Sequence, residues 1–327
     1  MEESIKGIAG QFNFNPEIQN SDKFGAYKKY VVSGMGGSHL AADILKNLLT
    51  VDGREVSIII HQDYGLPQNI SQDVSNSDTL FIASSFSGNT EETLDFAKCV
   101  LEKNWPLAII TKGGELLKLA DRNKLPFVLI PDVQIQPRIA LGYSILALSK
   151  LLNQKKLIQE FQTLSSRINT VYWQEKGVEL QKELGGRIPV IYASERNRMI
   201  AYNWKIKFNE TGKIPAFFNI FPELNHNELA GFDHNEKSVD LSQKFLIIAL
   251  TDSDDDKRIQ RRMEVTLDVL SRKGITVKKI DLEGETRVLK IFNSLIFADW
   301  TAFYTAKYYG HEPNDVPLVE EFKRRLN

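Results

Sequence analysis

The chain is poor in several features that mark whole classes of protein. It has a single cysteine, Cys99, which excludes a disulfide framework and a cysteine-rich metal site. Its 41 Lys and Arg balance 42 Asp and Glu, giving a net charge of -1 without the basic excess typical of nucleic-acid-binding proteins. No stretch reaches the ~18 consecutive apolar residues of a membrane span, and the acidic N-terminus has no signal-like apolar run. We therefore expect a cytoplasmic protein that binds neither nucleic acid nor membrane.

What the chain does contain is a repeated alternation of strand-like and helix-like segments. Its 327 residues are enough for two domains of about 150 residues each. The expected strands are uninterrupted apolar runs, which are typical of parallel sheets covered by helices on both faces. A polar break at residues 153–156 (NQKK) separates an N-terminal domain, residues 1–153, from a C-terminal domain, residues 154–327. The pattern predicts the α/β class, with two doubly wound domains that are mainly parallel sheets flanked by helices.

The periodicity places these elements along the chain. Strands are expected at residues 30–33, 56–60, 79–83, 105–110, 127–130, 188–192, 245–250 and 275–277. Helices are expected at residues 40–49, 91–103, 141–152, 157–184, 199–208, 257–273 and 287–309, the fourth as one long linking helix.

A hydroxyl-rich loop, residues 84–93 (SSFSGNTEET), lies between the third expected strand and the helix after it. Ser85, Ser87 and Thr90 supply hydroxyl donors, and Gly88 lets the backbone approach a ligand closely. A helix N-terminus adds free backbone N–H groups and a favourable dipole for an anion. The carboxyl edge of a doubly wound sheet is also where ligands bind. The loop is therefore expected to bind the phosphate of a sugar.

A second loop, residues 34–38 (GMGGS), follows the first expected strand. It lacks the later glycine of the dinucleotide fingerprint G-x-G-x-x-G, so a nucleotide is not indicated. Its Gly37 amide and Ser38 hydroxyl can instead contact the sugar. Arg138 follows a proline near a helix start, where a cation is electrostatically misplaced. That position suggests that Arg138 meets an anion.

The chain also offers a carboxylate and an imidazole that can move protons. Glu210 lies in the segment NETGK at a helix end, and His226 lies in ELNHNE between Glu223 and Glu228, which could orient the ring. Isomerisation between C1 and C2 of a sugar requires a rigidly held base that removes a proton from carbon. With the hydroxyl-rich loop, these residues indicate an aldose–ketose isomerase acting on a phosphorylated hexose. The spacing of the histidines fits no familiar metal site.

Five motifs in order resemble a known family. Residues 36–38 (GGS) and 85–90 (SFSGNT) look like a sugar isomerase (SIS) domain. Residues 137–143 (PRIALGY), 209–213 (NETGK) and 223–228 (ELNHNE) narrow the resemblance to the bifunctional phosphoglucose/phosphomannose isomerases, which are built from two SIS domains. The similarity covers nearly the whole chain.

The resemblance implies roles for individual residues. Glu210 matches the base that shuttles the proton through a cis-enediol(ate), and His226 matches the residue that assists ring opening and is donated by a neighbouring subunit. A homodimer with a shared site is then expected, with no metal or cofactor. Lys323 matches an active-site lysine near the C-terminus, with Lys307 as its rival. Arg138 and this lysine would stabilise negative charge.

The substrate range and the alternatives remain open at this point. Family members that accept mannose 6-phosphate use a threonine that has no clear match at residues 314–317 (NDVP), which leaves Thr301 and Thr305 as possible substitutes. We expect interconversion of glucose 6-phosphate, and of mannose 6-phosphate, with fructose 6-phosphate. A glucosamine-6-phosphate-forming relative would need a glutaminase domain with an N-terminal cysteine, and this chain starts at Met1. A non-catalytic SIS-type sugar-phosphate sensor is disfavoured because Glu210 and His226 are both present.

Overall fold

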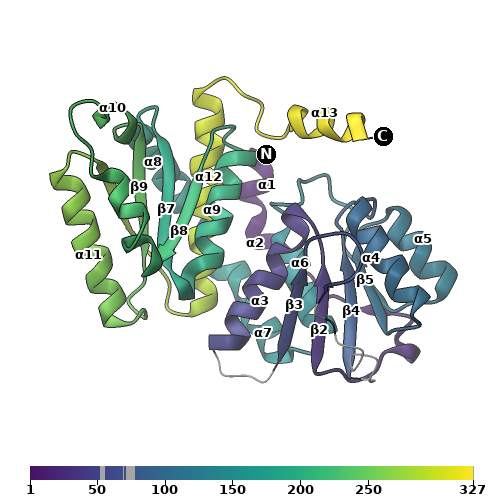
Figure 1. The fold of residues 1–327 in the computed structure, drawn as a ribbon. Coiled ribbons are helices and arrows are strands. Elements are labelled where there is room, and N and C mark those ends of the chain that lie inside the picture. The colour runs from purple at the N-terminus through teal and green to yellow at the C-terminus, as the bar shows by residue number, and fades with distance from the viewer. Residues whose placement is uncertain (52–55, 69, 71–77, 327) are drawn as a thin grey trace. The chain divides into compact units, whose positions relative to one another are not determined.

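A computed structural model describes residues 1–51, 56–68, 70 and 78–326 of the chain (Figure 1). Its contacts divide the chain into two compact units. The N-terminal unit is Gly7–Arg167, and the C-terminal unit combines Met1–Lys6 with Ile168–Asn327.

The N-terminal unit is built on one six-stranded sheet with the order β1-β6-β5-β4-β2-β3. All neighbouring strands are parallel except β1, which is antiparallel to β6. Every residue of β4 and β5 is buried, so helices cover both faces of the sheet. Its elements are α2 (Ile8–Gln11), β1 (Ile18–Gln19), η1 (Ser21–Lys23), β2 (Lys29–Ser33), η2 (Gly36–Ser38), α3 (Leu40–Val51), β3 (Ser57–His61), β4 (Thr79–Ser84), α4 (Glu91–Glu102), β5 (Leu107–Thr111), α5 (Gly114–Asn123), β6 (Phe127–Leu129), α6 (Leu141–Leu151) and α7 (Lys155–Arg167).

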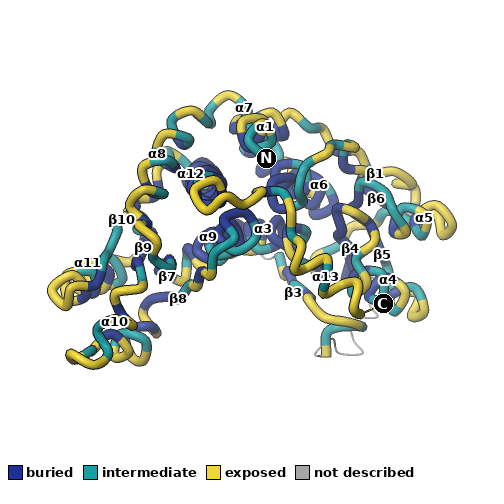
Figure 2. The backbone as a smooth tube through the Cα atoms, turned by 90° about the horizontal axis from the view of Figure 1, so that it is seen from above, coloured by how far each residue is buried: buried dark blue, intermediate teal, exposed yellow. Residues whose placement is uncertain are grey.

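The C-terminal unit has a four-stranded, wholly parallel sheet with the order β10-β9-β7-β8. Its helix α12 is buried along most of its length, and the C-terminal α13 has no buried residue, as Figure 2 shows. Its elements are α1 (Glu2–Lys6), α8 (Thr170–Leu184), β7 (Ile188–Ser194), η4 (Glu195–Asn197), α9 (Arg198–Glu210), β8 (Phe217–Phe221), η5 (Glu223–Asn225), η6 (Glu228–Phe232), α10 (Val239–Ser242), β9 (Phe245–Thr251), α11 (Lys257–Arg272), β10 (Thr276–Asp281), α12 (Arg287–Tyr308) and α13 (Pro317–Leu326).

The two sheets share one topology. The four parallel strands of the N-terminal sheet that come first along the chain are β2, β3, β4 and β5. Across the sheet they lie in the order β5-β4-β2-β3, which is fourth, third, first and second along the chain. The C-terminal strands β7, β8, β9 and β10 lie in the matching order β10-β9-β7-β8, again fourth, third, first and second. The predicted α/β class with two doubly wound domains is therefore confirmed. Among the described residues no helix is long and apolar enough to cross a membrane.

Two details differ from the sequence-based expectations. The linking helix expected at residues 157–184 is two helices, because the side chain of Asn169 accepts a hydrogen bond from Tyr172 N at 3.1 Å and starts α8 anew. The division expected after residue 153 instead falls after Arg167, because Leu157 and Phe161 of α7 are buried in the N-terminal unit, where α7 packs on α6 and α2. The N-terminal α1 packs against α8 and α12 of the C-terminal unit.

The sequence also left two strands unpredicted, the two-residue β1 and the edge strand β8. Strand β8 pairs with β7 at the edge of the C-terminal sheet, with Val190 opposite Phe217 and Ser194 opposite Phe221. Its first three residues are exposed or half-buried, and Asn219 interrupts its apolar residues (FFNIF), so it lacks the uninterrupted apolar run that predicts a buried strand. This strand separates two residues of the candidate site.

Candidate functional site

The serine loop, residues 85–90, leaves the buried strand β4 and enters α4, as the sequence predicts. Ser85 is buried, and its Oγ lies 2.8 Å from Thr90 Oγ1. The same Oγ accepts a hydrogen bond from Gly88 N at 3.1 Å, while Ser87 Oγ accepts one from Asn89 N at 3.2 Å. These bonds fix the loop as a compact turn whose hydroxyls gather at the N-terminus of α4.

The same turn leaves backbone donors available. Within the described part of the chain, no acceptor bonds the N–H groups of Ser87, Thr90 or Glu91. These groups lie in the loop and at the start of a 12-residue helix, where the helix dipole also favours negative charge. A phosphate group has the charge and the acceptor oxygens that such an arrangement binds.

Glycines at two positions allow the backbone of the serine loop to lie directly against the backbone of the β5–α5 loop. Gly88 has φ +73°, and a Cβ there would lie 1.8 Å from Gly113 O. Gly114 has φ +72°, and a Cβ there would lie 2.4 Å from Ser87 O. Asn89 adds a side-chain bond, because its Oδ1 accepts from Glu115 N at 3.0 Å. The two backbones touch so closely that only glycine fits at either position.

The second predicted loop lies beside the first. Ser38 Oγ accepts a hydrogen bond from Phe86 N at 3.1 Å, and Ser38 O accepts one from Ser84 Oγ at 3.1 Å. Gly37 is buried in η2, and a Cβ there would lie 2.6 Å from Arg138 N. The N-terminal unit therefore brings five predicted features together: Gly37, Ser38, the serine loop, Arg138 and the N-terminus of α4.

Arg138 is only 2% exposed, although it carries a charge. It lies in the turn before α6, and the buried side chain of Gln11 clamps that turn. Gln11 Nε2 donates to Ile139 O at 2.8 Å, and Gln11 Oε1 accepts from Gly142 N at 3.0 Å. Gln11 could not be identified from the sequence, because a glutamine more than a hundred residues from the motif it contacts belongs to no pattern.

In the C-terminal unit, Glu210 is the last residue of α9 and lines a pocket of about 610 Å³. Lys213, at φ +58°, closes the helix end, because its Nζ donates to the carbonyl oxygens of Glu210 and Asp315. The described lining also includes His311 and Glu312, which follow α12. His311 could not be identified from the sequence, since a lone histidine in a short loop has no periodicity or motif to mark it.

His226 is exposed and follows η5, beyond the carboxyl end of β8. Glu210 ends the helix that leads into the amino end of the same strand. A five-residue strand spans ~16 Å, so the C-terminal unit does not bring these two residues together. Figure 1 shows α9 and β8 side by side.

The carboxylates beside His226 are bonded elsewhere, against the expectation that they orient its ring. Glu223 Oε1 accepts from Asn227 Nδ2 at 2.9 Å. Glu228 Oε1 accepts from Tyr192 OH at 2.6 Å, and burial together with this bond raises the pKa of Tyr192. No hydrogen bond links either carboxylate to the imidazole among the residues that the structure describes.

The candidate lysines lie apart from the Glu210 pocket. Lys323 is exposed on α13, and Lys307 is exposed near the end of α12, with its Nζ 5.8 Å from the centre of the Phe303 ring. Neither belongs to the described pocket lining, where the lysine present is Lys213. The assignment of Lys323, with Lys307 as its rival, as the active-site lysine stays a prediction.

The two threonines considered for mannose specificity are buried inside the C-terminal unit. Thr301 and Thr305 are 0% and 1% exposed within α12. Thr301 Oγ1 donates to Phe297 O at 2.9 Å, and Thr305 Oγ1 donates to Thr301 O at 2.7 Å. Both hydroxyls are therefore bonded within their own helix, and the expectation that they substitute for the family's threonine is wrong.

Two doubly wound units, one with a hydroxyl-rich loop at the carboxyl edge of its sheet, define a protein of the sugar isomerase class. The model of the bacterial phospho-glucose isomerase C-terminal SIS domain matches residues 174–326. A solved structure of a hypothetical protein from Thermus thermophilus superposes with a TM-score of 0.69 at 17% identity, covering 99% of this chain and 87% of that one, which shows the fold.

Sequence comparison narrows the class further. The bifunctional phosphoglucose/phosphomannose isomerase of Caldicellulosiruptor bescii is 33% identical over 91% of this chain and 89% of its own length. The protein of the same name from Thermoplasma acidophilum is 31% identical over 99% of this chain and 97% of its own length. The chain belongs to the bifunctional phosphoglucose/phosphomannose isomerase family, as its motifs predict.

Proposed function

We propose that the chain is an aldose–ketose isomerase that interconverts glucose 6-phosphate, and also mannose 6-phosphate, with fructose 6-phosphate through a cis-enediol intermediate. The observation that carries the substrate class is the serine loop, whose hydroxyls and unbonded backbone N–H groups converge at the start of α4. The names of the relatives at 33% and 31% identity support the reaction. A phosphorylated sugar as substrate also favours a cytoplasmic location.

In this proposal the N-terminal unit binds the anionic end of the substrate. Ser85, Ser87 and Thr90 donate to the phosphate oxygens, and Gly37 and Ser38 contact the sugar. The closeness of Ser38 to the serine loop supports this division of roles, because Ser38 Oγ already bonds Phe86 N.

The chemical step belongs to Glu210, which moves a proton between C2 and C1. Its position in a pocket of about 610 Å³ fits a carboxylate that meets a ligand better than one on a solvated helix face. Arg138 and Lys323 stabilise the negative charge of the enediolate. Among these roles, binding the phosphate and removing the proton can be tested separately.

His226 assists ring opening in this proposal, and a second copy of the chain supplies it. The separation of Glu210 and His226 by the length of β8 supports a site shared between two subunits of a homodimer. The exposed position of His226 also leaves its imidazole available to a partner.

A coupled assay with glucose 6-phosphate and mannose 6-phosphate tests the reaction, and Glu210→Gln tests the base. The substitution removes the proton acceptor but keeps the size of the side chain, so turnover should be lost while binding of fructose 6-phosphate persists. A loss of less than about tenfold, which corresponds to ~1.4 kcal/mol in the barrier, would contradict the assignment. Glu312→Gln, in the same pocket, is the matched control and should retain turnover.

The competing function is a sugar-phosphate sensor without catalysis. It predicts that the unmodified chain binds fructose 6-phosphate with the same affinity as Glu210→Gln and turns over neither hexose phosphate. Measuring binding and turnover on one preparation separates the sensor from the isomerase.

A further inference from the structure

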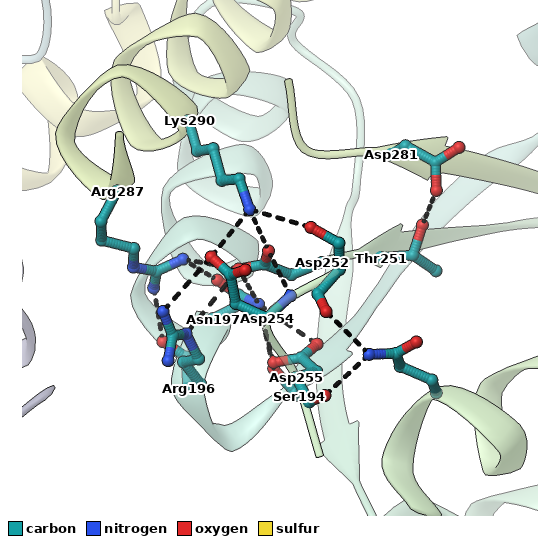
Figure 3. Close-up of polar contacts among 12 residues, drawn as sticks. Ser194, Arg196, Asn197, Thr251, Asp252, Asp254, Asp255, Asp281, Arg287 and Lys290 are labelled. Carbon is teal, nitrogen blue, oxygen red and sulfur yellow. Dashed lines mark hydrogen bonds and ion pairs between the residues drawn. The ribbon is translucent and has the colours of Figure 1, made fainter. Parts of the chain in front are cut away.

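A network of charged side chains fills the carboxyl edge of the C-terminal sheet, at the ends of β7 and β9 (Figure 3). Asp252 is fully buried at its centre, with Oδ1 2.7 Å from Lys290 Nζ and Oδ2 3.0 Å from Arg287 Nη1. Asp254 Oδ2 lies 2.9 Å from Lys290 Nζ and 3.7 Å from Arg196 Nη2. The proposed reaction uses none of these residues.

This network occupies the same topological position as the proposed phosphate site. Because the two sheets share one strand order, the loop after β9 corresponds to the serine loop after β4, and η4 after β7 corresponds to η2 after β2. Helix α12 packs on α9 as α6 packs on α3. Arg287, the first residue of α12, thus corresponds to Arg138 before α6.

The corresponding loops differ in the charge they carry. The serine loop, residues 85–90 (SFSGNT), has no acidic residue, so an anion must come from outside. The loop after β9, residues 252–256 (DSDDD), brings its own anions to the cations of η4 and α12. Ser194 at the end of β7 also donates to Asp255 Oδ1 at 2.7 Å.

The charges within the network cancel. Three cations, Arg196, Arg287 and Lys290, face three carboxylates, Asp252, Asp254 and Asp255. Asp252 accepts from both Lys290 and Arg287, and Arg287 also donates to Arg196 O at 2.8 Å. These bonds leave no surplus of positive charge for a ligand.

We infer that the C-terminal unit contains a closed counterpart of the phosphate site, in which Asp252 and Asp254 take the place of a bound phosphate. The two carboxylates bond the cations that an anion would otherwise neutralise. A chain with this network binds one phosphorylated ligand, at the serine loop, although it has two sheets of the same topology. The number of ligands in the unmodified chain rests on the proposed function, whereas the closure of the C-terminal site does not.

The two carboxylates contribute differently to the closure. Asp252 is fully buried, and burial opposes its charge, yet the bond from Lys290 keeps its pKa below the ordinary value. Asp254 is 51% exposed and faces the same Lys290 from the solvent side. Removing the Asp254 charge therefore frees cationic capacity while the buried pair stays in place, so Asp254 is the residue to change.

The test compares Asp254→Ser with the unmodified chain by equilibrium dialysis against labelled inorganic phosphate. We expect the variant to bind one more phosphate per chain than the unmodified protein. Asp254→Asn, which keeps the shape of the side chain, should show the same gain. Asp240→Ser removes an exposed carboxylate of α10 and makes the same change in net charge, so it is the matched control and should gain none.

A second variant locates the added site. In Asp254→Ser with Lys290→Met, the added phosphate should be lost because its main cation is gone. The inference fails if folded Asp254→Ser and Asp254→Asn bind no additional phosphate, or if Asp240→Ser gains as much. It also fails if the Lys290→Met change leaves the added phosphate in place. The readout is a difference between variants, so absence of phosphate binding by the unmodified chain would count against the serine-loop proposal and not against this one.

Discussion

Glu210 and His226 flank strand β8, one before its amino end and the other beyond its carboxyl end. The reason lies in the parallel connection: α9 must run back along the sheet to reach the start of β8. Glu210 therefore ends up at the opposite edge of the sheet from the loop that carries His226. The five-residue strand that separates these two edges spans ~16 Å.

This separation predicts complementation between two inactive variants. Glu210→Gln and His226→Gln should each lose turnover, and mixing them after subunit exchange should restore about a quarter of the unmodified activity, because a mixed homodimer holds one intact site. Activity is measured before and after exchange at equal total concentration.

The control for this experiment is His311, the imidazole that lines the Glu210 pocket within the same chain. If His226→Gln stays active while His311→Gln loses turnover, a single chain contains the complete acid–base pair. The shared-site proposal would then be wrong, and no restoration should occur on mixing.

Changing Gly88 to alanine should disrupt the serine loop. The new Cβ would lie 1.8 Å from Gly113 O at a backbone φ of +73°, so the loop must move. We expect fructose 6-phosphate affinity to fall by at least tenfold and stability to fall by ~1–3 kcal/mol. Gly10→Ala in α2 is the matched control, since a Cβ there meets nothing within 4 Å. Equal affinity in both variants would contradict the role of the loop.

Gln11 should position Arg138 for its work on the substrate. Gln11→Leu removes the bond to Ile139 O in the turn before α6 and the bond from Gly142 N in the first turn of α6. It leaves these buried backbone groups unbonded, which costs ~1–3 kcal/mol of stability. It should also lower kcat. In an Arg138→Ala background, the Gln11 change should lower stability as before without lowering the residual kcat further. An equal kcat loss in both backgrounds would make Gln11 a purely structural residue.

The buried ion pair between α9 and α12 predicts that losing one partner destabilises the protein more than replacing both. Lys207 Nζ lies 2.5 Å from Asp299 Oδ1, and both side chains are 3% exposed. Lys207→Met alone leaves a buried carboxylate without its cation and should cost ~3–5 kcal/mol in urea unfolding. Adding Asp299→Leu should recover most of that loss. If the double variant is less stable than Lys207→Met, the unpaired buried carboxylate is not the cause of the loss.

In the charged network, two carboxyl groups should change the free energy of unfolding in opposite directions as the pH falls. Burial opposes ionisation of Asp252, but the Lys290 bond lowers its pKa below 3.8, so its contribution is present above pH 3.8 and is lost as the pH falls through the folded value. Burial raises the pKa of Asp255 above 3.8, so its protonation in the folded state adds stability as the pH falls through that raised value.

Urea unfolding between pH 7 and pH 3 measures both effects. Relative to the unmodified chain, Asp252→Asn should lose less stability on acidification, and Asp255→Asn should lose more. Parallel curves for the two variants would contradict the assigned directions.

Local chemistry along the chain was enough to predict the fold class and the N-terminal half of the candidate site. Uninterrupted apolar strands are typical of a parallel sheet covered on both faces, and the loops after such strands meet at one edge. That is why the serine loop, Gly37 and Ser38 could be placed together before their contacts were known. Arg138 could be identified because a positive charge near a helix N-terminus is electrostatically unfavourable, which suggests a function. The structure places its backbone against Gly37.

Packing determined the rest, because it depends on partners distant in sequence. The apolar run of the half-exposed strand β8 is broken by Asn219, so the strand was not recognised and the separation of Glu210 from His226 could not be foreseen. The inward direction of Thr301 and the clamp of Gln11 on α6 depend on which helix faces meet. The charged network needs η4, the loop after β9 and the start of α12 in one place, since a carboxylate such as Asp252 is stable in the interior only beside cations that the fold brings to it.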